Sequence, residues 1–376
     1  MEIDLKERIG IDRTILCDFN VVTIDIKKLE SKLNDESYNH FIQIEFNGNS
    51  PIVLDDGSKI AKLKVQDRRF GYLEVSFGTS NLTKNKYIRS SLGIEVTGEF
   101  RNLQNMNCDE YRSRIYEVFQ MLEQEYGIKA KHDDVRVKRL ELNATFYIDE
   151  PYANYRKAIL LMIRNVPAKM YQNCKDNNSV KYATWSQANV RTGADELETA
   201  LVKNDSIELK IYNKGKHLKD IGEMEGTDRD IMRIEYTFKN QKVLDKAFGD
   251  NRVSSLTDAK VNALYRKFFN RDILNRYKKW RAENTQQLID LVVKHRQLNK
   301  HWTSSFFREC REIEQTRVLP VLFSIEDMRL VFKALHKNSD VARDKFRRFK
   351  AQATYESDMF GNTKRIEEIF RKIDMM

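Results

Sequence analysis

The sequence is poor in cysteine and contains no segment typical of a membrane span or a secretion signal. Its four cysteines are scattered, and no two have the spacing of metal ligands. The N-terminal sequence MEIDLKERIG is charged and has no apolar stretch of a signal peptide. No apolar run approaches the ~20 residues that span a bilayer. We therefore expect a cytoplasmic protein with reduced cysteines, without disulfides and without a membrane partner.

Positive charge is in excess. The formal net charge is +10 over 376 residues, and a basic balance of this size favours an anionic partner, of which nucleic acid is the commonest. A lysine-rich, solvated surface would give the same balance, so charge alone does not decide between the two.

Three segments alternate strictly between apolar and polar residues, as half-buried strands do. They are residues 139–146 (R-L-E-L-N-A-T-F), 206–214 (S-I-E-L-K-I-Y-N-K) and 232–238 (M-R-I-E-Y-T-F). If these strands are neighbours, one sheet face is apolar and the other is polar. The polar face would carry Arg139, Glu141, Asn143, Thr145, Glu208, Lys210, Tyr212, Lys214, Arg233, Glu235 and Thr237.

Glu141 and Glu235 are candidate metal ligands. Each carboxylate stands between apolar neighbours, and two carboxylates close together in a poorly solvated site repel each other. A divalent cation relieves that repulsion, and oxygen ligands suit Mg²⁺ or Mn²⁺. The alternative is that each carboxylate pairs with Arg139 or Arg233, which share its face two residues away.

Tyr212 is a candidate nucleophile. A phenol with an ordinary pKa of ~10 reacts poorly until its phenolate is stabilised. Lys210 and Lys214 flank Tyr212 on the same face and would supply positive charge. The alternative is a structural strand tyrosine with a packed ring and a hydrogen-bonded hydroxyl.

Three motifs together resemble a known family. R-L-E-L-N-A-T-F, S-I-E-L-K-I-Y-N-K-G-K-H-L and I-M-R-I-E-Y-T-F-K-N-Q-K-V-L, in this order, are similar to motifs of the rolling-circle replication initiators of filamentous phages and related plasmids. These nickases are distantly similar to HUH endonucleases and plasmid trans-acting Rep proteins. The resemblance covers roughly residues 60–250. It implies that Tyr212 is the nucleophile, Lys214 its partner, and Glu141 and Glu235 the ligands of Mg²⁺ or Mn²⁺.

The resemblance implies a replication initiator that nicks and rejoins one DNA strand through a covalent 5′-phosphotyrosine, in the cytoplasm of a bacterial host. The partners would be single-stranded or hairpin origin DNA, duplex origin DNA and a host helicase, and a homodimer stays open. Arg139, Arg233 and Lys210 would contact phosphate or orient the carboxylates. Two alternatives remain open: a conjugative relaxase, and a non-catalytic DNA-binding regulator on a nickase scaffold.

The sequence departs from the family pattern in three ways. Glu141 stands where the family usually has aspartate. No His-x-His pair exists, and His132 and His217 are single histidines, so whether either completes a metal site stays open. Tyr212 is expected on a strand, whereas many HUH enzymes carry the tyrosine on a helix.

The pattern changes along the chain and predicts an α+β fold with two parts. Residues 1–250 form the predicted endonuclease domain, an antiparallel or mixed sheet with helices on one face; residues 256–376 form a helical DNA-binding domain. Expected elements in the first part are strands at 14–26, 41–46, 59–65, 71–77 and 93–100, helices at 109–126 and after Pro151, and a loop or short helix at 192–204.

Two stretches of the second part are candidate DNA contacts. Residues 265–281 interleave basic and aromatic side chains, including Lys278 and Lys279, so aromatics could stack on bases while cations neutralise phosphates. The alternative is a helix with core aromatics. Helices at 324–335 and 339–350, the second with Lys345, Arg347 and Arg348, would suit a helix-turn-helix, although any helical hairpin looks similar.

Overall fold

The structure is a computed structural model. It describes residues 6–17, 20–35, 45–46, 52–67, 71–79, 94–101, 103, 105–131, 135–164, 199–203, 205–220, 230–298, 302–317, 325–353 and 361–376. His132 lies outside these residues, as does most of the expected strand at 41–46.

The described strands pair antiparallel into one large sheet and one small one. The large sheet has the order β10-β11-β12-β9-β1-β7-β6-β5-β3, with β4 also paired to β5, and β2 pairs with β8 separately. The strands are β1 (Ile9–Cys17), β2 (Asn20–Ile24), β3 (Glu45–Phe46), β4 (Ile52–Val53), β5 (Lys59–Asp67), β6 (Gly71–Thr79), β7 (Ile94–Arg101), β8 (Ile128–Lys131), β9 (Arg136–Tyr147), β10 (Thr199–Lys203), β11 (Ile207–Asn213) and β12 (Ile231–Phe238).

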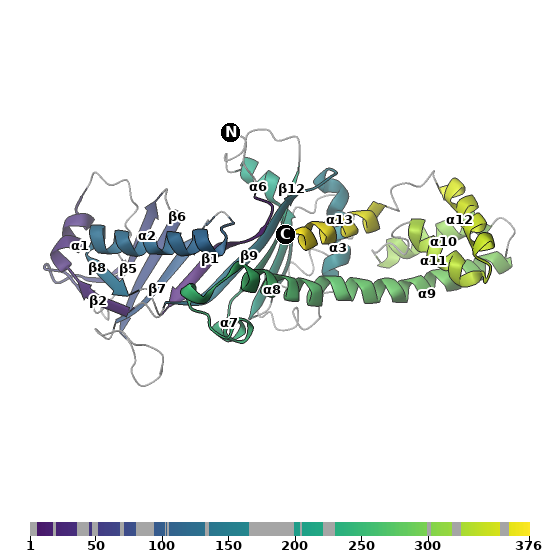
Figure 1. The fold of residues 1–376 in the computed structure, drawn as a ribbon. Helices are drawn as coiled ribbons and strands as arrows, with labels where there is room; N and C mark the ends of the chain where they lie inside the picture. Colours follow the sequence, from purple (N-terminus) through teal and green to yellow (C-terminus); the bar gives the residue numbers. More distant parts are fainter. Residues whose placement is uncertain are drawn as a thin grey trace.

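Helices flank the sheet and make up the region after β12 (Figure 1). They are α1 (Ile26–Leu33), α2 (Cys108–Tyr126), α3 (Tyr152–Arg164), α6 (Lys214–Asp220), α7 (Gln241–Phe248), α8 (Asp258–Phe269), α9 (Asn275–Leu298), α10 (Trp302–Arg317), α11 (Ile325–Leu335), α12 (Ser339–Ala353) and α13 (Gly361–Met375), with a short 3₁₀ turn η2 (Val253–Ser255) and a π turn η3 (Asn270–Leu274).

An antiparallel sheet followed by a helical region is what the sequence predicts, and both are confirmed. Membership of the HUH fold remains a prediction. No helix in the described ranges is long and apolar enough to cross a membrane.

Helix α2 shows how local sequence sets an element. Asn107 and Glu110 form a reciprocal capping box, in which each side chain accepts a hydrogen bond from the other's backbone N–H. At the other end, Gly127 takes a left-handed conformation with φ of 68° and closes the helix. The sequence prediction of a helix at 109–126 is therefore confirmed.

Two predicted elements of the sheet region are wrong. The expected strand at 14–26 is interrupted, because β1 ends at Cys17 and helix α1 begins after Asp25, whose side chain caps it. The loop or short helix expected at 192–204 contains β10, which extends the sheet beyond β11. Its sequence T-A-L-V-K is too short for the alternation to stand out from its polar surroundings.

One face of β12 and β9 forms the main core with helix α8. Tyr236 and Phe238 of β12 pack edge to face against Tyr265 and Phe268 respectively. The hydroxyl of Tyr265 donates to the backbone oxygen of Ile234 at 3.0 Å. Tyr265, Phe268, Phe269 and Tyr277 are all buried. The aromatics of residues 265–281 therefore belong largely to the core, so the expectation that they stack on bases is wrong for these four rings.

A second core lies in the helical lobe, which we define as α10, α11, α12 and the part of α9 that packs on them. Figure 1 shows this lobe at the far end of α9, away from the sheet. Its buried residues are Leu288, Val292, Phe306, Phe307, Cys310, Met328, Val331, Phe332 and Phe349.

The sheet core extends past the predicted domain boundary at residues 250–256. Residues of α8, η3 and the start of α9 belong to it, from Val261 to Tyr277. Helix α13 also returns to it through Ile366, Ile369 and Ile373 and packs on α3. A boundary at 250–256 would therefore divide one continuous core.

Candidate active site

The polar face predicted from alternation forms across β11, β12 and β9. The register puts Tyr212, Arg233 and Thr145 in one row, Lys210, Glu235 and Asn143 in the next, and Glu208, Thr237 and Glu141 in a third. Side chains opposite each other on antiparallel strands lie about 5 Å apart at Cβ, so each row is a set of neighbours.

The centre of this face is withdrawn from solvent. Glu141, Arg233 and Glu235 are only 7%, 5% and 4% exposed, whereas Lys210 and Tyr212 on β11 are half-buried. Charges in such surroundings interact more strongly than they do in water, and each needs a partner.

Tyr212 lies between positive and negative groups. Its hydroxyl donates to Oε2 of Glu235 at 3.4 Å, and Arg233 is its cross-strand neighbour. Burial raises the pKa of the Tyr212 phenol; Arg233 opposes that rise, and the carboxylates of Glu235 and Asp12 add to it. Tyr212 is therefore a neutral phenol at physiological pH that needs a base to become a nucleophile.

Lys210 forms ion pairs with two carboxylates of the polar face. Its Nζ lies 3.0 Å from Oε1 of Glu235 and 3.2 Å from Oε1 of Glu208. Burial acts to lower the pKa of Lys210, but the carboxylates of Glu235, Glu208 and Glu141 outweigh it and raise the pKa above its ordinary value. Lys210 is therefore a fixed positive charge beside the Tyr212 row.

Arg233 is held by two groups, one of which the sequence did not reveal. Its Nε donates to Oγ1 of Thr145 at 2.8 Å, and its Nη1 donates to Asp12 at 3.2 Å. Asp12 falls at a register shift between Ile11 and Arg13 in the pairing of β1 with β9. Sequence alternation does not reveal such a shift, so Asp12 was not among the expected site residues.

Glu141 is the residue of this face whose ionised form is disfavoured by its surroundings. Its Oε2 accepts a hydrogen bond from Thr237 at 3.1 Å. Burial raises the pKa of the Glu141 carboxyl to about 7, with further contributions from the carboxylates of Glu235 and Asp12. Glu141 is thus partly protonated at neutral pH, and a bound cation would stabilise its ionised form.

The alternative to a metal site was that Glu141 and Glu235 each pair with Arg139 or Arg233. The structure does not show these pairs among the described residues. Glu235 pairs with Lys210, and the ion pair of Arg233 is with Asp12. Glu141 makes no ion pair with Arg139 among the described residues, and the buried Nε of Arg139 has no hydrogen-bond partner there. No arginine therefore offsets the burial and the neighbouring carboxylates that disfavour the ionised form of Glu141.

The donor set fits a hard divalent cation in chemistry, because Glu141, Glu235 and Asp12 are three carboxylates that interact electrostatically. In the part of the chain that the structure describes, however, no three His, Cys, Asp or Glu side chains form a group with the geometry of a metal site. Mg²⁺ usually takes only one or two protein carboxylates and completes its shell with water and substrate phosphate. Two acids are enough for that mode of binding.

Lys214 and His217, two further expected or possible members of the site, lie on helix α6. Helix α6 begins at Lys214, so the alternation that assigned Lys214 to the Tyr212 face ends at Asn213. The same helix brings the ring of His217 edge-on to that of Tyr212, with centroids 6.3 Å apart. Of the two lysines expected to flank Tyr212, Lys210 is the one that lies on its strand face, where it pairs with Glu235 and Glu208.

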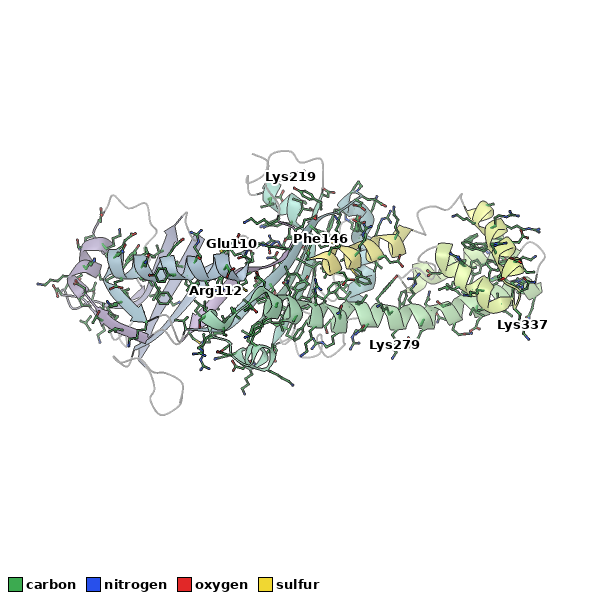
Figure 2. The ribbon with its side chains drawn as sticks, viewed as in Figure 1. Glu110, Arg112, Phe146, Lys219, Lys279 and Lys337 are labelled. Carbon is green, nitrogen blue, oxygen red and sulfur yellow. The ribbon has the colours of Figure 1, made fainter. Side chains whose placement is uncertain are left out.

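The remaining predicted DNA contacts lie outside the sheet face. Lys278 and Lys279 are exposed on α9, and Lys279 projects outward from it (Figure 2). Lys345, Arg347 and Arg348 are exposed on α12 of the helical lobe. Their role in binding DNA remains a prediction.

Comparison with known proteins gives one likeness to report. No known family profile matches the chain, and no curated protein matches it. A solved structure of the rolling-circle replication initiator protein from Geobacillus stearothermophilus aligns with 71% of this chain and 85% of its own, at 12% sequence identity and a TM-score of 0.26. The proposal of a function therefore rests on the side chains of the polar face.

Proposed function

We propose that this protein is a rolling-circle replication initiator that nicks and rejoins single-stranded DNA through Tyr212. The observation that carries the proposal is a half-buried tyrosine whose hydroxyl points to a buried carboxylate, Glu235, while a buried arginine, Arg233, faces it across the strands. An ordinary structural tyrosine needs one hydrogen-bond partner and gains nothing from two neighbouring charges of opposite sign. A nucleophile that must lose a proton and then attack an anion needs both signs of charge.

The chemical step follows from this arrangement. Glu235 accepts the phenolic proton, and the Tyr212 oxygen attacks a backbone phosphorus in line with its bond to the 3′ oxygen. The new bond is Tyr212 O–P, the broken bond is P–O3′, and the departing 3′ oxygen takes a proton from solvent. The products are a 5′-phosphotyrosine and a free 3′-OH, and reversal of the step rejoins the strand.

Two cations of this chain stabilise the charge that builds up. Arg233 is preorganised by Thr145 and Asp12, so its free N–H directions can serve the phenolate and a phosphate oxygen without rearrangement. Lys210 compensates the charge that Glu235 carries before it accepts the proton. Mg²⁺ or Mn²⁺, held by Glu141 and Glu235, would supply Lewis-acid stabilisation of the phosphate when bound.

The test is the detection of a covalent protein–DNA bond. The protein is incubated with Mn²⁺ and a labelled pool of single-stranded oligonucleotides of random sequence, and the adduct is digested and sequenced by mass spectrometry. We expect the DNA-linked peptide to contain Tyr212. An adduct at any other tyrosine, or none under any metal condition, would refute the assignment.

Two variants sharpen the result. Tyr212→Phe removes one hydroxyl and should abolish the adduct while single-stranded DNA still binds. Tyr116→Phe, at an exposed tyrosine of α2, is the matched control and should leave adduct formation unchanged. Equal adduct yields from the two variants would exclude Tyr212 as the nucleophile.

A further inference from the structure

Three helices of the helical lobe bring Arg296, His336 and Lys345 together. The Nη1 of Arg296, near the end of α9, lies 3.5 Å from Nε2 of His336, which follows the last residue of α11. Lys345 of α12 is close enough to act electrostatically on the same imidazole. Arg296 and Lys345 are exposed, and His336 is partly exposed.

This cluster differs from the three arginines of α12. Arg347 and Arg348 each pair with Asp344 at 2.9 Å, and Arg343 pairs with Asp340 at 3.0 Å. Those arginines therefore each have a carboxylate partner within their own helix. Among the described residues, by contrast, no carboxylate forms an ion pair with Arg296, His336 or Lys345. Their positive charge remains available to a ligand.

The imidazole is held in its neutral form by its surroundings. A guanidinium N–H that faces Nε2 requires an unprotonated nitrogen there. Partial burial lowers the pKa of His336, and the charges of Arg296 on α9 and Lys345 on α12 lower it further. On its own helix, the ring lies nearly parallel to that of Phe332, 6.5 Å away. The groups that face His336 are thus two cations, from α9 and α12, and a phenyl ring of its own helix.

We propose that Arg296, His336 and Lys345 form a binding site for one phosphate of duplex DNA. An oxyanion between the three groups would let the arginine and a protonated imidazole both donate to it, which replaces one long hydrogen bond by two charge-assisted ones. Binding is therefore coupled to uptake of one proton by His336.

The surroundings favour a DNA backbone over a small anion. The cluster lies at the three-residue turn between α11 and α12, and Lys337, which follows His336, projects from the far end of the lobe (Figure 2). The turn also contains Asn338, whose side chain caps α12. A duplex backbone can follow such an exposed basic edge for several phosphates. The proposed nicking function enters this inference only through the choice of DNA as the ligand.

The sign of the pH dependence follows from linkage. A phosphate raises the pKa of His336, so the gain in affinity is complete below the pKa of the free protein and is lost as the pH rises through the pKa of the complex. A rise of one pKa unit corresponds to a tenfold change in affinity, so we expect about tenfold tighter binding at pH 5.5 than at pH 8.

The experiment measures binding of the full chain to a labelled duplex of arbitrary sequence by fluorescence anisotropy between pH 5.5 and 8 at constant ionic strength. His336→Gln should lose the pH-dependent part of the affinity seen in the wild type. Arg296→Ala should lower the log–log salt slope by about 0.9, the contribution of one phosphate. The matched control is Arg347→Ala, at an already paired arginine, which should change the slope less.

Protonation is read directly from the histidine ring signals in NMR spectra of the full chain, with the His336 signal assigned from its loss in His336→Gln. The pKa of His336 should rise when duplex is added. An unchanged pKa in the bound state, equal pH dependence in wild type and His336→Gln, or an equal shift on addition of inorganic phosphate alone would each overturn the proposal. The tyrosine–DNA adduct is measured separately on single strands, so failure here leaves the proposed function standing.

Discussion

Glu141 offers the sharpest test of the electrostatics of the polar face. Its carboxyl has a pKa of about 7 in the folded protein, against an ordinary value of 4.5. At pH values above 7 the folded chain must carry an ionised Glu141 in a site that disfavours it. The shift corresponds to about 3 kcal/mol of folding free energy.

The sign is opposite to that of most carboxylates. Between pH 4.5 and 7 the folded state retains a proton that the unfolded state has released, so stability falls as the pH rises through this window. Glu141→Gln keeps an oxygen that can accept from Thr237 and removes the charge. The variant should therefore gain about 3 kcal/mol relative to wild type on going from pH 4.5 to pH 8.

Hydrogen exchange of peptides from β9 and β12 is a suitable assay, because the helical lobe has its own core and would obscure a global transition. After correction for the intrinsic exchange rate, the protection ratio of Glu141→Gln to wild type should increase about 100-fold between pH 4.5 and 8.

Glu208→Gln provides the matched control on the same face. Burial acts to raise the pKa of Glu208, but hydrogen bonding and charge from Lys239 and Lys210 outweigh it and lower the pKa. That variant should lose stability relative to wild type as the pH rises toward 4.5 from below, and its ratio to wild type should then stay nearly constant up to pH 8. If the ratio for Glu141→Gln does not change with pH, or both variants respond with the same sign, the electrostatic account of this face is wrong.

Divalent cations extend the same measurement. At pH 8, Mg²⁺ should protect β9 and β12 in the wild type, because a ligand that binds only the folded state stabilises it. The protection should be much smaller in Glu141→Gln. Equal protection in both proteins would exclude Glu141 as a ligand, without any reference to catalysis.

Further predictions concern the framework that holds the two cores. Asp327, 1% exposed, accepts two hydrogen bonds from Arg281, and Arg281 also donates to Glu367. Asp327→Ala should lower the free energy of unfolding in urea by about 3 kcal/mol, because it leaves the part-buried Arg281 without its main partner. Glu367→Ala, at a side chain that is 58% exposed, should cost less than about 1 kcal/mol, and equal effects would contradict the burial argument. Gly127→Ala should cost about 2–3 kcal/mol and Gly57→Ala about 1 kcal/mol. Both glycines have positive φ, but only at Gly127 would an added Cβ lie 2.9 Å from Asp25. Similar melting temperatures for the two variants would contradict this steric argument.

The polar face could be predicted because it depends on a strong local signal. Period-two alternation in three segments fixes which side chains share a face, and the structure places Glu141, Lys210, Tyr212, Arg233 and Glu235 together as expected. The apolar side of the same strands is covered by helices, as the alternation also implies.

The parts that could not be predicted depend on register and on tertiary choice. Asp12 joins the site at a register shift, which has no signature in the alternation of β1. Lys214 was assigned to the strand face, but the chain turns into α6 there. Arg233 has several acids within reach, and only the fold determines that Asp12 is its ion-pair partner. Similarly, nothing local distinguishes a basic helix with core aromatics from one that stacks on bases.

The return of α13 to the sheet makes the helical lobe an insertion and not a C-terminal appendage. The chain leaves the sheet core along α9, builds the lobe, and comes back to end beside α3 (Figure 1). A protein truncated at residue 250 would lack α8 and α13 and would uncover Tyr236 and Phe238. A shortened protein with an intact sheet core must instead be made by excising the lobe internally and joining α9 to α13 with a linker. The same two junctions would allow the lobe to be exchanged for another helical module while the sheet is left intact.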